Sequence, residues 1–121
     1  MVKTKNFNPA YDTKLACSCC GAYRVSQEAL DKLQKVRDLC NRPLRITSGY
    51  RCERHPEEAK KAKGGSHTHG VAFDIAVSNG AERNQVVRQG ILAGAKGIGI
   101  ANTFVHLDFL EDRTVEVMWC Y

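Results

Sequence analysis

The sequence lacks the long apolar runs, the leader and the basic stripe that mark three large classes of protein. No stretch approaches the roughly 20 consecutive apolar residues of a membrane-spanning helix. The first residues, MVKTKNFNPAYD, carry no apolar segment of the kind that a secretory signal peptide contains. Lys and Arg are scattered among acids instead of alternating with aromatic residues. We therefore expect a chain synthesised in the cytoplasm without a signal peptide, with no membrane insertion and no nucleic acid as partner.

No repeat, linker or low-complexity segment divides the 121 residues, and this length fits one domain. Hydrophobic residues make up 43% and charged residues 26%, a balance typical of globular proteins. A chain of this size can bury a core without cross-links. The net charge of +5 favours a polyanionic partner, either nucleic acid, which the scattered basic residues disfavour, or an anionic cell wall. We predict a single domain over residues 1–121 and a monomer.

Cysteine usage leaves several interpretations open. The even number of cysteines is compatible with disulfides, although a chain without a leader is expected to meet a reducing environment. CSCC, at residues 17–20, resembles half of a zinc knuckle, but no second pair at knuckle spacing follows it. We interpret the thiols as free or partly buried, with disulfides and a structural metal as alternatives. The six are Cys17, Cys19, Cys20, Cys40, Cys52 and Cys120.

Hydrophobic periodicity predicts mixed helices and strands after an irregular N-terminal wrap at residues 1–24. The helix over 26–40 has Ser26 as its N-cap and includes Leu39 in its apolar face. The helix over 79–93 directs Val86, Val87 and Ile91 inward. Short connections between the later strands favour an α+β domain with a mainly antiparallel sheet flanked by helices. A short helix is also expected at 56–63, and strands are expected at 44–47, 71–77, 98–100, 104–110 and 115–119.

The segment SHTHGVAFDI, at residues 66–75, carries a histidine and an acid on either side of a glycine. Gly70 allows a tight turn from the loop that holds His67 into the strand that holds Asp74. An acid inside an apolar strand is costly unless it is paired, hydrogen-bonded or bound to a cation. Asp74 therefore either accepts hydrogen bonds from a neighbouring loop or binds a metal ion.

A second segment, FVHLDF at residues 104–109, places His106 and Asp108 on one face of a strand. A lone histidine there would be a satisfied core residue. Together with His67 and Asp74, however, it completes two imidazoles and one carboxylate. That is the ligand set of a catalytic zinc, which leaves its fourth position to water.

The chain resembles the M15 family of zinc D-Ala-D-Ala carboxypeptidases. The resemblance rests on these two segments and on ITSGYRC (46–52), GIGI (97–100) and the closing MWCY. The family's close relatives include L-Ala-D-Glu endopeptidases of phages, and the resemblance covers roughly residues 15–121. It implies a Hedgehog/DD-peptidase-like fold. It also implies Zn²⁺ as cofactor and a peptidoglycan stem peptide as substrate. The resemblance places the metal on His67, Asp74 and His106.

The resemblance also assigns roles around the metal. Arg51 falls on the family's arginine, which would bind a substrate carboxylate or stabilise an oxyanion. Ser48 is expected to shape the same substrate-binding turn and is not a nucleophile, because no base accompanies it. Many members carry an acid three residues before the last zinc histidine, where this chain has Thr103. Asp108 is therefore our candidate for the general acid/base or for a partner that orients a ligand. Gly65 stands where many members carry serine, a departure that we expect to be minor. The family pattern leaves the position of His69 variable, so His69 is not among the expected ligands.

The sequence thus favours a zinc metallopeptidase that hydrolyses peptidoglycan stem peptides. Its size and charge suit a phage endolysin that acts on the cell wall, and equally a cytoplasmic enzyme of wall recycling. The alternative is a non-catalytic zinc-bearing binding module of the same fold, which the departure at Thr103 favours. A third interpretation is a nucleic-acid binder built on a cysteine-bound zinc.

Overall fold

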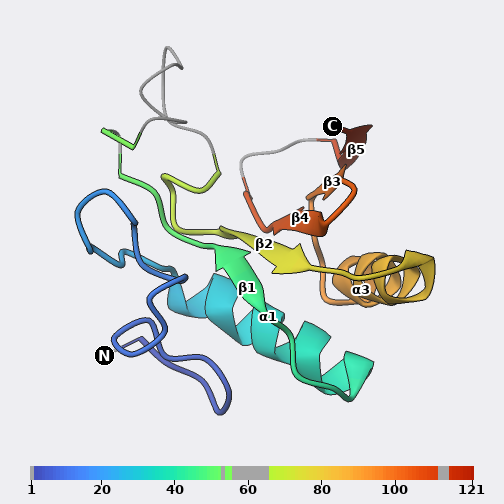
Figure 1. Cartoon of the computed structure of the whole chain (residues 1–121), viewed down its shortest axis with the longest axis horizontal. Coiled ribbons are helices and arrows are strands. Elements are labelled where there is room, and N and C mark those ends of the chain that lie inside the picture. The colour runs from blue at the N-terminus through green and yellow to red at the C-terminus, as the bar shows by residue number, and fades with distance from the viewer. Residues whose placement is uncertain (1, 53, 56–65, 112–114) are drawn as a thin grey trace.

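The computed structural model of the chain describes residues 2–52, 54–55, 66–111 and 115–121 (Figure 1). These residues form two helices and a five-stranded sheet with the strand order β1-β2-β4-β3-β5. The α+β class is confirmed, whereas the helix expected at 56–63 lies outside the described residues. The elements are α1 (Gln27–Cys40), β1 (Ile46–Ser48), β2 (Ala72–Ala76), α3 (Gly80–Leu92), β3 (Gly97–Ile100), β4 (Phe104–Asp108) and β5 (Val117–Cys120).

The sheet is antiparallel between all neighbouring strands except β3 and β5, which run parallel. The expectation of a mainly antiparallel sheet is therefore confirmed. The two strands that carry the histidine and acid motifs, β2 and β4, are neighbours in the sheet. This pairing brings two motifs that are 32 residues apart in sequence to the same place.

Helix α1 begins where the sequence indicates, because the Ser26 hydroxyl accepts a hydrogen bond from the Ala29 amide. Its buried face includes Leu33 and Val36. The expectation that Leu39 shares this face is wrong, since 42% of that residue is exposed. At 3.6 residues per turn, Leu39 lies about 120° around the helix from Leu33 and falls beyond the edge of the apolar stripe.

Helix α3 packs on the sheet through Val86 and Gly90. A Cβ atom on Gly90 would come within 2.7 Å of the Leu107 side chain, so the glycine permits a close approach of the helix to β4. Ile91 was expected to point inward, but 54% of it is exposed. It lies about 140° around the helix from Val86, away from the contact.

Residues 2–25 contain turns and no helix or strand, yet they contribute Phe7 and Leu15 to the common core. The Tyr50 amide donates to the Leu15 carbonyl over 3.0 Å. A Cβ atom on Gly49 would lie 2.8 Å from the Leu15 backbone, so the N-terminal segment is seated directly on the loop after β1. Neither described helix is both long enough and apolar enough to cross a membrane.

Candidate metal centre

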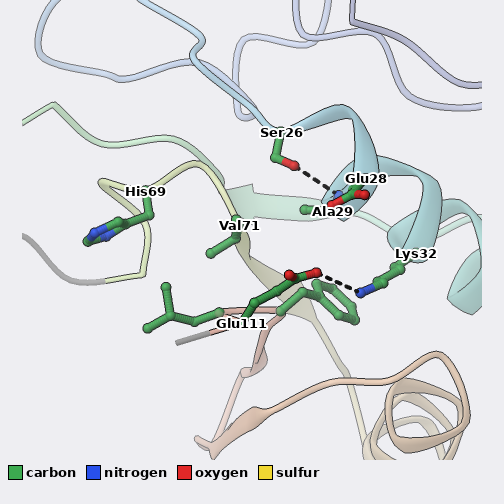
Figure 2. A pocket seen from close by; sticks show the side chains of 9 residues that line it. Ser26, Glu28, Ala29, Lys32, His69, Val71 and Glu111 are labelled. Carbon is green, nitrogen blue, oxygen red and sulfur yellow. Dashed lines mark hydrogen bonds and ion pairs between the residues drawn. The ribbon is translucent and has the colours of Figure 1, made fainter. Parts of the chain in front are cut away.

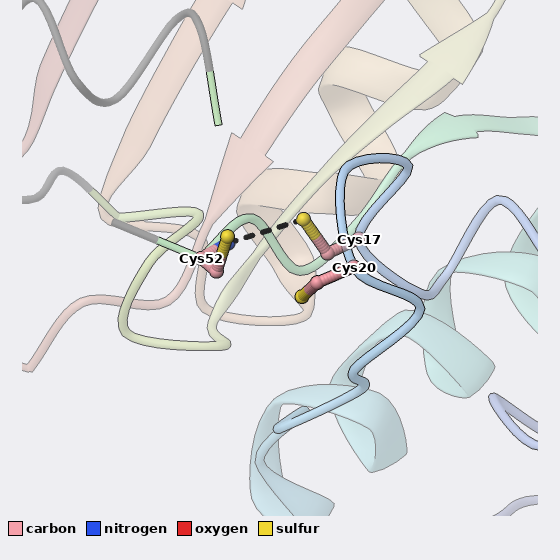
Figure 3. Close-up of side chains that lie close together, drawn as sticks. All are labelled: Cys17, Cys20 and Cys52. Atoms are coloured by element: carbon pink, nitrogen blue, oxygen red, sulfur yellow. Dashed lines mark hydrogen bonds between the residues drawn. The ribbon is translucent and has the colours of Figure 1, made fainter. Parts of the chain in front are cut away.

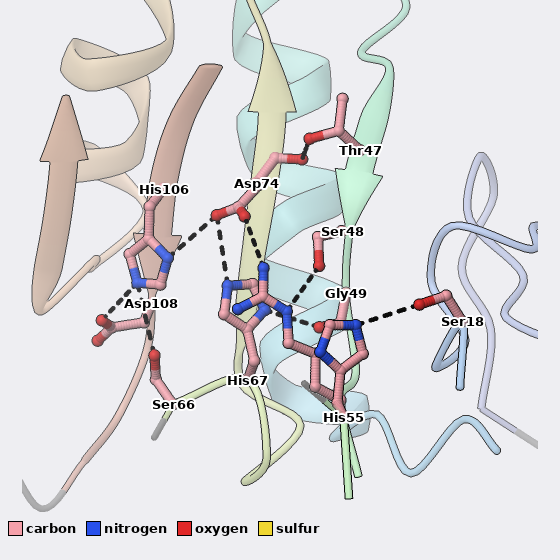
Figure 4. Close-up of polar contacts among 11 residues, drawn as sticks. Ser18, Thr47, Ser48, Gly49, His55, Ser66, His67, Asp74, His106 and Asp108 are labelled. Atoms are coloured by element: carbon pink, nitrogen blue, oxygen red, sulfur yellow. Dashed lines mark hydrogen bonds and ion pairs between the residues drawn. The ribbon is translucent and has the colours of Figure 1, made fainter. Parts of the chain in front are cut away.

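A row of residues crosses one face of the sheet. Ser48 is paired with Asp74, Asp74 with His106, His106 with Gly99, and Gly99 with Trp119. Residues directly opposite one another on neighbouring strands project to the same face. The polar side chains of β1, β2 and β4 therefore converge above the middle of the sheet, as Figure 4 shows.

His67 reaches this row from the loop before β2. Gly70 has φ +72°, and a Cβ atom there would collide with the Arg24 carbonyl, so this position requires glycine. The His67 Nδ1 atom lies 2.7 Å from the Gly49 carbonyl oxygen. Because a carbonyl can only accept, Nδ1 carries the proton and donates. The other ring nitrogen, Nε2, faces Asp74 at 3.3 Å from its Oδ1 atom.

His67, Asp74 and His106 form a compact and buried group. Their ligand atoms all lie within 4.8 Å of one another. The Oδ1 atom of Asp74 faces both rings, at 3.3 Å from His67 Nε2 and 3.1 Å from His106 Nδ1. Two imidazole nitrogens and a carboxylate oxygen that converge in this way fit a zinc ion with an open fourth position. The structure thus brings together all three predicted ligands.

The electrostatics of the group also favour a cation. Burial would raise the pKa of Asp74, but hydrogen bonds from His106 and His67 outweigh it and hold that pKa well below its usual range. Burial would likewise lower the pKa of His106, but its hydrogen bonds to Asp108 and Asp74 raise it. The carboxylates therefore attract positive charge to the point where the ligand atoms meet.

Asp108 stands on the side of His106 away from Asp74 (Figure 4). Its Oδ2 atom lies 2.9 Å from His106 Nε2, and its exposed fraction is 0%. A Cβ atom on Gly97 would collide with this carboxylate, so the glycine of β3 makes the space that Asp108 occupies. Ionised carboxylates can only accept, so both ring nitrogens of His106 can donate, Nε2 to Asp108 and Nδ1 to Asp74. A metal ion bound by Asp74 would take the place of the Nδ1 proton, while Asp108 keeps the proton at Nε2.

Arg51 approaches the same group from the loop after β1. Its Nη2 atom lies 3.4 Å from Asp74 Oδ2, while its Nε atom donates to the Ser48 hydroxyl over 3.1 Å. The two oxygens of Asp74 thus face different partners, Oδ1 the histidines and Oδ2 the guanidinium. Of the Arg51 side chain, 18% is exposed, so the positive charge stays accessible at the edge of the site.

The remaining candidates lie elsewhere. Thr103 is exposed and precedes β4, where its carbonyl accepts from the Val77 amide. His69 lines a pocket beside the start of α1, together with Lys32 and Glu111, which approach to 4.0 Å (Figure 2). His55 contacts the Ser18 hydroxyl at 3.1 Å. In the described part of the chain, neither histidine belongs to the ligand group.

Sequence reasoning missed one neighbour of the site, Trp119. Its ring centroid lies 5.2 Å from that of His106. A Cβ atom on Gly99 would lie 2.8 Å from Trp119 Nε1, so this glycine makes room for the indole beside the histidine. The GIGI segment, which is β3 itself, was the available signal, because glycines at alternate positions of a strand leave space on one face for neighbouring side chains.

Comparison with known proteins identifies a family for this chain. The family described as Peptidase M15 matches residues 5–108, a range that includes His67, Asp74, His106 and Asp108. No curated protein matches the chain significantly.

Proposed function

The chain belongs to the M15 family of peptidases, and from this premise we propose that it is a zinc-dependent peptidase that hydrolyses peptidoglycan stem peptides. The observation that carries the proposal is the convergence of His67, Asp74 and His106 within 4.8 Å, buried on one face of the sheet. A zinc ion bound there would supply an acidified water and polarise the scissile carbonyl.

The protein's own contribution begins with the two histidines. The Gly49 carbonyl holds the proton of His67 at Nδ1, and Asp108 holds the proton of His106 at Nε2. Each contact fixes a tautomer and the rotation of a ring, and leaves the other nitrogen directed at Asp74. Partners of this kind raise the basicity of a ligand and its affinity for metal.

Arg51 is suited to bind the substrate. A guanidinium can hold a carboxylate by two parallel hydrogen bonds, and it also stabilises negative charge that develops on a carbonyl oxygen. Stem peptides carry free carboxylates. Ser48 would act through Arg51, because its hydroxyl accepts from Nε and thereby limits the orientation of the guanidinium.

For Asp108, the geometry favours an orienting role over proton exchange with the substrate. A general acid or base must come within hydrogen-bond reach of the reacting groups, directly or through one water. Asp108 has no exposed surface, and His106 lies between it and Asp74. We therefore propose that Asp108 positions His106.

The bond that is cleaved determines the product. A D-Ala-D-Ala carboxypeptidase releases free D-Ala, whereas an L-Ala-D-Glu endopeptidase creates a new amino terminus at D-Glu. A phage endolysin of either type would solubilise fragments of the intact wall. The non-catalytic binding module stays the second candidate, because Thr103 offers no carboxylate at the position where many family members carry one.

The test incubates zinc-loaded protein with purified peptidoglycan and follows the products by mass spectrometry. We expect one of the two products, and none from Asp74→Ala. His55→Ala is a matched control, since it removes a histidine outside the ligand group and should keep activity. Protein that holds its zinc and binds peptidoglycan but releases no product would establish the binding module instead.

A further inference from the structure

A second group of metal-binding side chains lies apart from the His67–Asp74–His106 site. The sulfur atoms of Cys17, Cys20 and Cys52 all lie within 4.8 Å of one another (Figure 3). Cys19 Sγ is 3.8 Å from Cys52 Sγ. Four thiolates around a zinc ion, each about 2.3 Å from the metal, are separated by about 3.8 Å in a tetrahedron.

The backbone around Cys17 is arranged to stabilise a thiolate. The Cys52 amide donates to Cys17 Sγ over 3.4 Å. An amide that points at the sulfur favours the thiolate, which is the form of cysteine that binds a metal.

The chain forms a tight turn around this sulfur. The Cys17 amide donates to the Ala22 carbonyl, and the Gly21 amide donates to the Cys17 carbonyl, both over 2.7 Å. Gly21 has φ +77°, a conformation that side chains other than glycine rarely adopt. The CSCC segment is thereby held as a short loop that faces Cys52.

We propose that Cys17, Cys20 and Cys52 bind a structural zinc ion, with Cys19 as the fourth thiolate. A closed set of four thiolates is typical of structural rather than catalytic zinc. Arg24 and Arg54 line the pocket beside these sulfurs, and their charges would offset the net negative charge of the centre. Thiolates also select zinc over the hard cations magnesium and calcium.

Such a centre would connect two segments that the catalytic site depends on. It would tie the N-terminal segment to Cys52, which directly follows Arg51. The Arg51 amide in turn donates to the His67 carbonyl over 3.3 Å. A zinc ion at the cysteines would therefore hold the loop that presents the substrate-binding arginine beside the ligand loop.

A disulfide between two of these cysteines is the competing explanation of their proximity. It would remove two electrons to an external oxidant and leave the remaining sulfurs unbound. The zinc centre requires no oxidant and accounts for all four sulfurs, as well as for the Cys52 amide that donates to Cys17 Sγ.

The test is the metal content of protein purified under reducing conditions. We expect two zinc ions per chain in the unaltered protein, and one in either Cys52→Ser or His67→Ala. The exposed Cys120 provides a matched control, since Cys120→Ser should keep both ions. Cys19→Ser should weaken binding at the cysteine site, and unchanged affinity there would exclude Cys19 as a ligand.

Cobalt substitution of the unaltered chain keeps the proposal testable where a variant fails to fold. A sulfur-to-cobalt charge-transfer band should appear, and it should persist in His67→Ala. One zinc per chain together with no such band would overturn the proposal, as would a disulfide between cluster cysteines found by peptide mapping. These experiments measure bound metal and do not measure peptide hydrolysis. Their outcome is therefore independent of the proposed peptidase activity.

Discussion

The replacement of Asp108 by asparagine tests the proposal that this buried carboxylate positions His106 at the candidate metal centre. Asp108 accepts from His106 Nε2 over 2.9 Å and has no exposed surface. Asparagine keeps the size of the side chain but removes its charge, and its amide can also turn a donor toward the ring. Either change weakens the hold on the tautomer that directs Nδ1 of His106 at the metal site.

The expected effect is on zinc affinity. Loss of a partner that orients a ligand costs about 10–100-fold in affinity, or about 1.4–2.8 kcal/mol at 1.4 kcal/mol for each factor of ten. Turnover should then recover at excess zinc. If Asp108 were instead the general acid/base, zinc affinity would hold while turnover fell by about two to four orders of magnitude.

A second variant displaces the Asp108 carboxylate through a steric clash and leaves its charge unchanged. Gly97→Ala adds a Cβ atom that collides with the Asp108 carboxylate, so it should displace this group from His106 and weaken zinc binding in the same direction. Zinc affinity is measured by competition with a chromophoric chelator, and turnover is measured across a zinc titration. Normal affinity and normal turnover in Asp108→Asn would refute both roles.

Three further predictions concern the ligands, the arginine and the fold. His67→Ala, Asp74→Ala and His106→Ala should each abolish zinc at this site; metal analysis that finds it fully occupied in all three would refute the assignment. Arg51→Ala should keep zinc and melting temperature but lose activity by about 100–1,000-fold, because one preorganised donor is worth roughly 3–4 kcal/mol. Arg51→Lys should not restore it fully, and a large fall in melting temperature with activity retained would instead indicate a structural ion pair. Ser26→Ala should lower the free energy of unfolding by about 1 kcal/mol, measured by urea denaturation, since it removes the cap of α1; unchanged stability would argue against that cap.

Local patterns in the sequence were sufficient for the elements that the structure describes and for the choice of candidate ligands. The start of α1 follows from Ser26, whose hydroxyl can satisfy an amide of the first turn wherever the helix packs. The strands that carry Asp74 and His106 are predicted by the alternation of apolar and other residues, because alternate side chains of a strand share a face. The motifs and the family resemblance then selected the three ligands, and the structure places them together.

The depth of burial and the pairing of strands depended on the tertiary structure. Leu39 and Ile91 are apolar and stand at helical spacing, but their exposure depends on the width of the face that a neighbour covers. Likewise, no local signal states that Asp74 is paired with His106, because register depends on contacts between strands.

The cysteines show the same limit over a longer distance. CSCC is an incomplete metal motif in the linear sequence, and Cys52 is separated from Cys17 by 35 positions. Only the packing of the N-terminal segment on the loop after β1 brings the Cys52 amide and sulfur to it. The types and spacings of residues predict the chemistry that a single helix, strand or loop can carry. A site assembled from several elements also depends on the distances between them, which are determined by the packing of the core.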